Sequence, residues 1–280
     1  MNTAIVTETT RPDIYVQETG SRGSPAVLFL HGVGNSGAMW KRHMAQLEGF
    51  HCLAPDLPGF GRSNSLLWTS RIDITDQMAS LIRTRVPEGR AHVIGLSLGG
   101  SIAHTLLARH HDVLDRVVID GCAALPWRGT RLLVAGVGLV SPVLRTKAMS
   151  AVVGRSFGLD EAAREDMRAA SPRAFRSAFA DANTIRISAA EVEATCPALL
   201  VAGEREMKPP VRASNAALAE LMPNAEARFA PGHGHGWLGK DAELHIRMVN
   251  AWLTSQPLPT ELAAETTQWD RGLVEQLIAR

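Results

Sequence analysis

The stretch HVIGLSLGG at residues 92–100 decides how this chain folds. Its first residues are those of a buried strand, and residues 97–109 continue with helical spacing. Between them, Gly95, Ser97 and Gly99 form a G-x-S-x-G pattern on a strand-to-helix turn. Such a turn pushes the serine hydroxyl out at the end of a sheet, and its glycines allow the backbone to approach closely. We therefore interpret Ser97 as a nucleophile rather than as an incidental serine in a glycine-rich turn.

A serine nucleophile that attacks a carbonyl needs donors for the developing negative charge. The N–H of Leu98 is one candidate, because it follows the nucleophile at a helix N-terminus, where the dipole favours negative charge. The second motif, His31-Gly32-Val33-Gly34, follows the apolar run 26–30 and offers the N–H of Val33. We predict an oxyanion hole made of Val33 and Leu98. His31 itself is interpreted as a brace for its loop.

Short apolar runs bounded by Gly, Pro and Asp alternate along the chain with segments of helical period. Continuous apolar runs indicate strands that are covered on both faces. The pattern predicts an α/β fold with a mostly parallel central sheet and helices on both faces. The predicted strands are Ile14–Gln17, Ala26–Leu30, Cys52–Ala54, Ala91–Gly95, Val117–Ile119, Ala198–Ala202 and Ala227–Ala230. The predicted helices are Ile72–Val86, Ser97–Arg109, Arg212–Leu221 and Ala242–Leu253.

One connection does not fit this alternation. Roughly 75 residues separate the strand that ends near Ile119 from the one that starts at Ala198, whereas connections usually have a few residues. This connection carries apolar helical segments at 131–144, 160–170 and 172–187. We predict a helical cap at 122–196 inserted between two parts of the core, 1–121 and 197–256, with a C-terminal tail and short helix at 257–280.

The segment Leu132–Val140 in this insertion is apolar on nearly every side, more so than a helix facing solvent needs. It is either a helix buried between cap and core, or a lid that lines an apolar pocket and shields it from water. Trp127 and Trp237 are candidates for the same pocket, and plain core positions are the alternative for both.

Four landmarks appear together in order: His31–Gly34, Asp56–Ser63 (DLPGFGRS), the turn at Ser97, and Pro231–His235 (PGHGH). With them the sequence resembles the α/β-hydrolase superfamily, in its branch of capped esterase, lipase and peroxidase-like enzymes. The resemblance covers nearly the whole chain apart from the predicted cap and the tail. It implies an α/β-hydrolase fold and a Ser-His-acid triad. It also implies a structural role for the second landmark, so Asp56 is not counted as catalytic.

The base is expected near the C-terminus, because the triad of this fold runs serine, acid, histidine along the chain. Two histidines compete, His233 and His235. The family's ending, a histidine preceded by glycine in a P-G-x-G-H arrangement, favours His235 and leaves His233 at a variable position.

The acid fixes the imidazole tautomer and stabilises the imidazolium. The family places it three residues after the glycine that ends the penultimate strand, which here is Glu206, where most relatives have Asp. Glu204 is interpreted as a surface charge. Asp120, directly after another strand, is the rival, since some members carry the acid there.

These residues predict a serine hydrolase that cleaves an ester-like bond of a small, apolar substrate through an acyl-enzyme, with no metal or organic cofactor. A C–C bond hydrolase, a lactonase, a perhydrolase or an acyltransferase would use the same triad. A non-catalytic ligand-binding member of the fold is the alternative from another class. Relatives that cleave carbon–halogen bonds or epoxides carry Asp in place of Ser97, so those two chemistries are not expected.

Composition agrees with a soluble enzyme. The chain has 280 residues, with 29 Lys and Arg against 28 Asp and Glu, which gives no electrostatic case for a nucleic acid partner. Three scattered cysteines, with no CxxC pattern, argue against disulfides or zinc. No segment reads as a signal peptide or a membrane span, so we expect a cytoplasmic protein whose partner is a small-molecule substrate. The oligomeric state is not readable.

Overall fold

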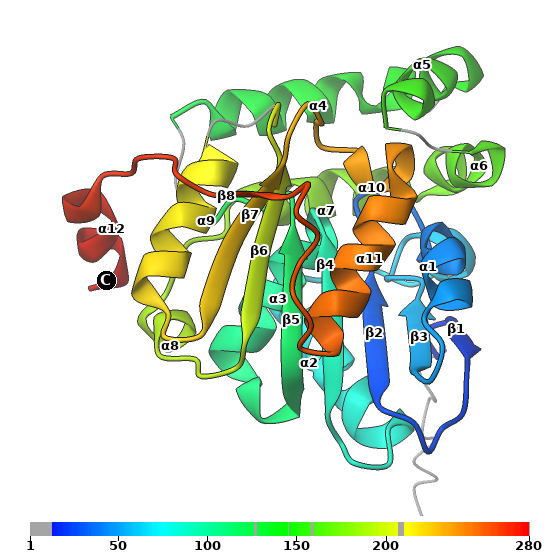
Figure 1. Cartoon of the computed structure of the whole chain (residues 1–280). Helices are drawn as coiled ribbons and strands as arrows, with labels where there is room; N and C mark the ends of the chain where they lie inside the picture. Colours follow the sequence, from blue (N-terminus) through cyan, green and yellow to red (C-terminus); the bar gives the residue numbers. More distant parts are fainter. Residues whose placement is uncertain (1–12, 126–127, 145, 158–159, 207–209, 280) are drawn as a thin grey trace, which may run out of the picture.

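An eight-stranded, mostly parallel sheet forms the centre of the molecule (Figure 1). The computed structural model describes residues 13–125, 128–144, 146–157, 160–206 and 210–279. The strand order is β1-β3-β2-β4-β5-β6-β7-β8, and only the outer pairs β1·β3 and β7·β8 are antiparallel. The strands are β1 (Val16–Thr19), β2 (Ala26–Leu30), β3 (His51–Pro55), β4 (Ala91–Leu96), β5 (Leu114–Asp120), β6 (Ala198–Gly203), β7 (Ala225–Ala230) and β8 (Ala263–Ala264).

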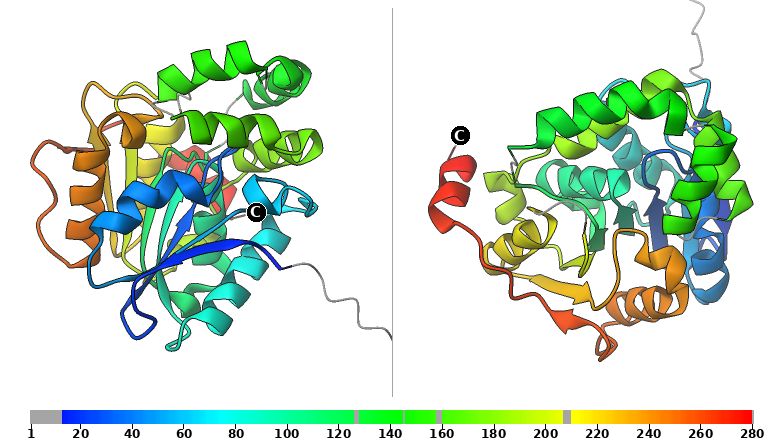
Figure 2. Two further views of the ribbon diagram at one scale, coloured as in Figure 1. Left: turned by 90° about the vertical axis from the view of Figure 1, so that its right-hand side faces the viewer. Right: turned by 90° about the horizontal axis from the view of Figure 1, so that it is seen from above.

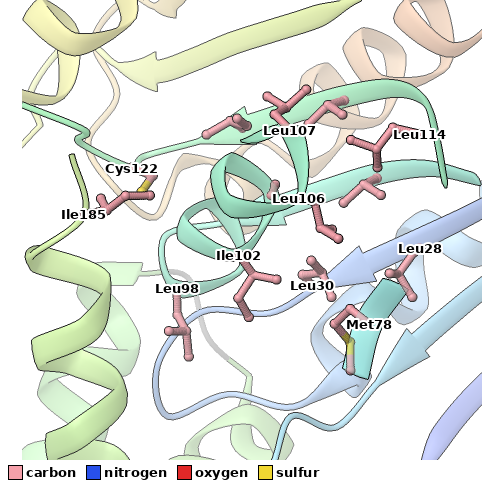
Figure 3. Packing of buried hydrophobic residues seen from close by; sticks show 14 of the residues in the cluster. Leu28, Leu30, Met78, Leu98, Ile102, Leu106, Leu107, Leu114, Cys122 and Ile185 are labelled. Atoms are coloured by element: carbon pink, nitrogen blue, oxygen red, sulfur yellow. The ribbon is translucent and has the colours of Figure 1, made fainter. Parts of the chain in front are cut away.

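Helices cover both faces of the sheet, which is why its inner strands consist of apolar residues almost throughout. The helices outside the β5–β6 connection are α1 (Lys41–Gln46), α2 (Arg71–Arg85), α3 (Leu98–Arg109), α9 (Pro210–Leu221), α10 (Trp237–Lys240), α11 (Ala242–Leu253) and α12 (Arg271–Ile278). On one face α2, α3 and α9 pack on alternate strand residues such as Leu30, with Met78 and Ile102 among the buried contacts (Figure 3). On the other face α1 and α11 pack on the intervening residues, such as Phe29 and Ile94. The predicted α/β fold class is confirmed.

Five helices occupy the connection between β5 and β6. They are α4 (Thr130–Leu144), α5 (Lys147–Phe157), α6 (Glu161–Ala169), α7 (Pro172–Asn183) and α8 (Ala189–Val192). In Figures 1 and 2, α4, α5 and α6 lie at the end of the molecule where the parallel strands finish, and the view from above shows them along its rim. A backbone bond ties the connection to the loop after β3, since Ser171 donates to Gly59 over 2.9 Å. A second bond, from Ile187 to Ala124 over 2.9 Å, joins the two ends of the connection. These helices therefore lie at the same end of the molecule as the loops after β2, β4, β5 and β6.

The structure corrects several sequence-based boundaries. β1 starts at Val16 rather than Ile14, and α7 ends at Asn183 rather than near Ile187. The helices α5 and α8 and the short strand β8 were not predicted. The outer boundaries differ because strand and helix ends depend on pairing and capping partners that lie elsewhere in the chain.

The apolar helix α4 is not buried on all sides. Leu132 and Leu139 on its outer face are 80% and 83% exposed, so the interpretation of a helix enclosed between cap and core is wrong for that face. Trp237 is fully buried and belongs to the core. Trp127 lies outside the described residues.

Candidate functional site

Ser97 sits in the sharp turn between β4 and α3. Its backbone has φ 54° and ψ −102°, a conformation that residues with a β-carbon rarely adopt. The backbone N–H of Ser97 donates to the carbonyl of Asp120 over 2.8 Å, which fixes the turn against the end of β5. A β-carbon at Gly95 would lie 2.4 Å from the Gly99 carbonyl oxygen, and one at Gly99 only 2.1 Å from that of Leu30. The tight turn therefore requires glycine at both positions.

The loop after β2 lies against the start of α3. The Gly99 N–H donates to the His31 carbonyl over 3.1 Å, so the segments carrying Val33 and Leu98 are tied together by a backbone bond. Leu98 is the first residue of α3, and the first N–H groups of a helix have no acceptor within it. This bond holds the loop after β2 against the first turn of α3, which begins directly after Ser97.

His31 lies beneath this loop and is fully buried. Its Nε2 accepts from the Leu57 N–H over 2.9 Å, and its Nδ1–H donates to the Gly32 carbonyl over 2.8 Å. Burial lowers the pKa of His31 to about 4, so the ring is neutral, as these two bonds require. His31 joins the loop after β2 to the loop after β3.

His235 and Glu206 come from the loops after β7 and β6 and meet at the same edge of the sheet. His235 Nδ1 lies 3.0 Å from Glu206 Oε2, and Glu206 Oε1 accepts from the Gly203 N–H over 3.3 Å. The Glu206 side chain is 3% exposed and that of His235 13%. A buried carboxylate on Nδ1 orients the imidazole and directs Nε2 away from the pair.

Gly121 places this pair beside Ser97. Its φ is +61°, and a β-carbon there would lie 2.7 Å from both Nδ1 and Cε1 of His235. Gly121 directly follows Asp120, which is in register with Leu96 and accepts the Ser97 N–H. The imidazole therefore packs on the backbone immediately next to Ser97.

The rival histidine, His233, has other partners. Its Nδ1 lies 2.7 Å from the carbonyl oxygen of Pro231, and its Nε2 lies 3.7 Å from Asp241 Oδ2. Glu204 is exposed, as expected, and its Oε2 also accepts from the Gly232 N–H over 2.7 Å. Both residues hold the loop in which His235 sits.

The rival acid, Asp120, is completely buried and has different neighbours. Its Oδ1 accepts from Trp237 Nε1 over 3.1 Å, and its Oδ2 lies 3.5 Å from His245 Nε2. Burial, with the nearby Glu206 charge, raises the pKa of Asp120 to about 8. Burial lowers the pKa of His245 to about 3, so this second carboxyl faces a neutral imidazole.

Asp56 holds a loop, in agreement with the role expected for its motif. Its two oxygens accept from the N–H groups of Gly37 and Arg62, each over 2.7 Å. A β-carbon at Gly61, where φ is +49°, would lie 2.3 Å from Asp56 Oδ2. The Asp56 carboxylate therefore joins its own loop to the loop after β2.

Three side chains near the site, those of Asp166, Met167 and Phe175, were not predicted from the sequence. A β-carbon at Gly34 would lie 3.1 Å from the Phe175 ring and 3.2 Å from Met167, so α6 and α7 press on the loop after β2. Asp166 on α6 makes a short hydrogen bond to the Ser36 hydroxyl of that loop. Amphipathic spacing identifies the helices but not which of their side chains reach a distant loop.

Other features of the described residues lie apart from this edge. Two surface hollows of about 710 and 840 Å³ flank β7 and β8 near the C-terminal tail. Among residues 13–279, outside the gaps named above, no three His, Cys, Asp or Glu side chains group as a metal site requires. No helix in that part of the chain is long and apolar enough to cross a bilayer.

A family model described as the alpha/beta hydrolase family matches residues 27–245. The chain belongs to this family. The resemblance inferred from the four landmarks is thereby confirmed. An enol-lactonase structure from Burkholderia xenovorans is similar to this hydrolase with a TM-score of 0.72 and 22% identity, covering 86% of this chain and 96% of that one.

Two curated relatives extend the comparison. The hydrolase is 26% identical to an AB hydrolase superfamily protein of Gibberella zeae, over 85% of this chain and 83% of that protein. It is 35% identical to Lipase LipV of Mycobacterium tuberculosis, over 46% of this chain and 49% of the lipase. Membership in a hydrolase family with such relatives supports an enzyme.

Proposed function

We propose that this hydrolase is a serine esterase whose triad is Ser97, His235 and Glu206. The single observation that carries the proposal is the His235–Glu206 pair, 3.0 Å apart and packed on Gly121 beside Ser97. A buried carboxylate on Nδ1 leaves Nε2 as the base, which is the arrangement that a serine hydroxyl needs for activation.

The reaction has two steps. Ser97 Oγ attacks the ester carbonyl while His235 Nε2 takes its proton, and the N–H groups of Val33 and Leu98 hold the oxyanion. His235 then protonates the departing alcohol, which leaves an acyl group on Ser97. In the second step His235 activates a water molecule that releases the acid. Glu206 stabilises the imidazolium in both steps.

We further propose that the inserted helices, residues 122–196, act as a cap over a core made of 1–121 and 197–256, followed by the tail at 257–280. The apolar side chains of Met167 and Phe175, pressed on the loop after β2, support an apolar substrate pocket beneath this cap. Names among the relatives, which include a lipase and a pimeloyl-[acyl-carrier protein] methyl ester esterase of Vibrio vulnificus, favour a carboxylic ester.

Cleavage of a carbon–carbon bond is the second candidate. One relative, 26% identical over 47% of this chain, is named a 2-hydroxy-6-oxononadienedioate/2-hydroxy-6-oxononatrienedioate hydrolase of Burkholderia vietnamiensis. A lactonase, a perhydrolase or an acyltransferase would also use these residues, because each of these reactions passes through an acyl group held on a serine.

Fluorophosphonate labelling followed by ester turnover tests the proposal. We expect one covalent adduct on Ser97, no adduct on Ser97→Ala, and turnover of short nitrophenyl esters that falls as the acyl chain outgrows the pocket. Labelling without ester turnover points to the carbon–carbon or acyl-transfer reactions. A wild-type protein that takes up no label contradicts the proposal and favours a ligand-binding member of the fold.

A further inference from the structure

The outer face of α4 carries an apolar stripe that nothing in the described chain covers. Leu132 is 80% exposed, Leu139 83%, Val140 43% and Val143 54%. Ala135 and Gly136, also exposed, complete positions that repeat every three or four residues along one side of the helix. We call these six residues the α4 face. Single exposed apolar residues are ordinary, but a continuous stripe of them marks an interaction surface.

The inner side of α4 packs on the rest of the protein. Leu133, Val134 and Val137 are half-buried, and Val137 packs on the main core cluster. Arg176 of α7 reaches α4 as well, with its Cδ 3.8 Å from the position of a β-carbon on Gly138. The α4 face is therefore a second apolar side, beyond what the fold uses.

The stretch of chain that carries α4 has charges of one sign. Residues 121–159 contain five basic residues and no acidic residue. Four of the five lie in the described chain and are exposed: Arg128, Arg131, Lys147 and Arg155. Acidic residues begin again at Asp160, which caps α6, and on α6 Glu161 is paired with both Arg164 and Arg168. Basic residues thus stand at both ends of the aliphatic stripe, and we call these four residues the basic margin.

The apolar α4 face and the basic residues beside it together indicate what binds there. Two copies joined through the α4 face would bring basic margin against basic margin, which like-charge repulsion disfavours. An anionic lipid surface matches both properties, because its headgroups attract the margin and its acyl boundary accepts leucine and valine side chains. The helix has 15 residues, about 22 Å, which suits lying in the interface rather than crossing the roughly 30 Å hydrocarbon core.

We propose that the α4 face docks this hydrolase on an anionic lipid–water interface, with α4 parallel to the membrane plane. Since α4 lies at the end of the molecule where β4 leads into Ser97, docking brings that end to the lipid boundary (Figure 2). Binding to lipid requires no turnover, so this proposal can be tested independently of the esterase assignment.

Vesicle flotation of the full chain tests it. At low ionic strength we expect wild type to float with phosphatidylglycerol vesicles, to bind phosphatidylcholine vesicles at least about tenfold more weakly, and to be released by salt. The double variant Leu132→Asn/Leu139→Asn should lose at least about tenfold in binding, because two large aliphatic side chains no longer insert. Arg131→Gln/Lys147→Gln should weaken binding only to the anionic vesicles.

Leu273→Asn is the matched control, because Leu273 is an exposed leucine (42%) on α12, on another side of the molecule (Figure 1). It should bind as wild type does, and circular dichroism reports whether each variant folds. Three results would overturn the proposal: no flotation with phosphatidylglycerol, full binding by the leucine double variant, or a wild-type dimer that Leu132→Asn/Leu139→Asn converts to monomer. Running the series in Ser97→Ala keeps the readout independent of catalysis.

Discussion

His235 Nδ1 lies 3.0 Å from Oε2 of Glu206, and the two residues sit on loops that follow neighbouring strands of the sheet. Asp120, at the end of the next strand, directs its carboxyl to Trp237 and His245 instead. We therefore expect Glu206→Gln to lower kcat by about 100- to 10,000-fold, since an amide cannot stabilise the imidazolium. Asp120→Asn should change kcat by less than about tenfold. Steady-state kinetics on a nitrophenyl ester measures both.

The two substitutions control for each other, because each replaces a buried carboxyl by its isosteric amide. The KM of both variants should stay near that of wild type, since neither residue forms the acyl pocket. The acid assignment is wrong if Glu206→Gln keeps near-normal turnover while Asp120→Asn loses it.

Most of the candidate site was predictable because its members follow strands whose apolar runs are easy to read. Ser97, Glu206 and His235 each come within a few residues of a predicted strand end, and parallel strands bring those ends to one edge. The choice between Glu206 and Asp120 was not decidable from sequence, because both follow neighbouring strands. Side-chain direction separates them, and that direction depends on Trp237, which arrives from a distant part of the chain.

Gly121→Ala should damage catalysis more than stability. A methyl group at this position meets Nδ1 and Cε1 of His235 at 2.7 Å, so the imidazole must move. A displacement of about 1 Å costs roughly 100-fold in rate, and we expect a fall in kcat of that order.

Gly89→Ala is the control for Gly121→Ala. Gly89 has a similar φ, +65°, but a β-carbon there meets nothing within 4 Å. Both variants place alanine at positive φ, and this backbone strain should lower the free energy of unfolding of each by about 1 kcal/mol in urea denaturation. Equal turnover by the two variants would show that the imidazole does not rest on Gly121.

Strain in the turn predicts that Ser97→Gly is more stable than Ser97→Ala. At φ 54° and ψ −102° a β-carbon is unfavourable, and glycine relieves this at a smaller entropic cost. We expect a difference of about 1 kcal/mol in the free energy of unfolding, measured by urea denaturation. Ser255, with φ 57°, offers a comparison away from the site, where Ser255→Gly and Ser255→Ala should differ in the same direction. Two variants of Ser97 with equal stability would mean that the turn holds no such strain.

A helix or strand could be predicted from the sequence where its own residues show a regular pattern. It could be predicted less well where its bounds depend on pairing with another element. The helix at Ala242–Leu253 was predicted with its observed bounds, because its apolar spacing is regular and Pro257 follows it. The strand β8 has two residues at the sheet edge, which only pairing with β7 defines. From the sequence, the α4 face could not be told from a buried surface, because a helix that is apolar on nearly every side does not show which side faces the protein.

Asp120 also predicts a pH dependence of stability. Burial and the Glu206 charge raise its pKa to about 8 in the folded state, against an unfolded value near 3.9. Between these values the folded state binds the extra proton, so its contribution to stability is complete below about pH 4 and is lost as pH rises to about 8.

Asp120→Asn mimics the protonated acid and does not titrate. The free energy of unfolding of wild type, minus that of Asp120→Asn, should therefore fall with pH by at most about 1.4 kcal/mol per unit and level off above pH 8. Urea unfolding of both proteins from pH 5 to pH 9 measures this difference, which also cancels the contribution of the buried histidines. A difference that stays flat from pH 5 to pH 9 would mean that the native protein holds no extra proton at Asp120.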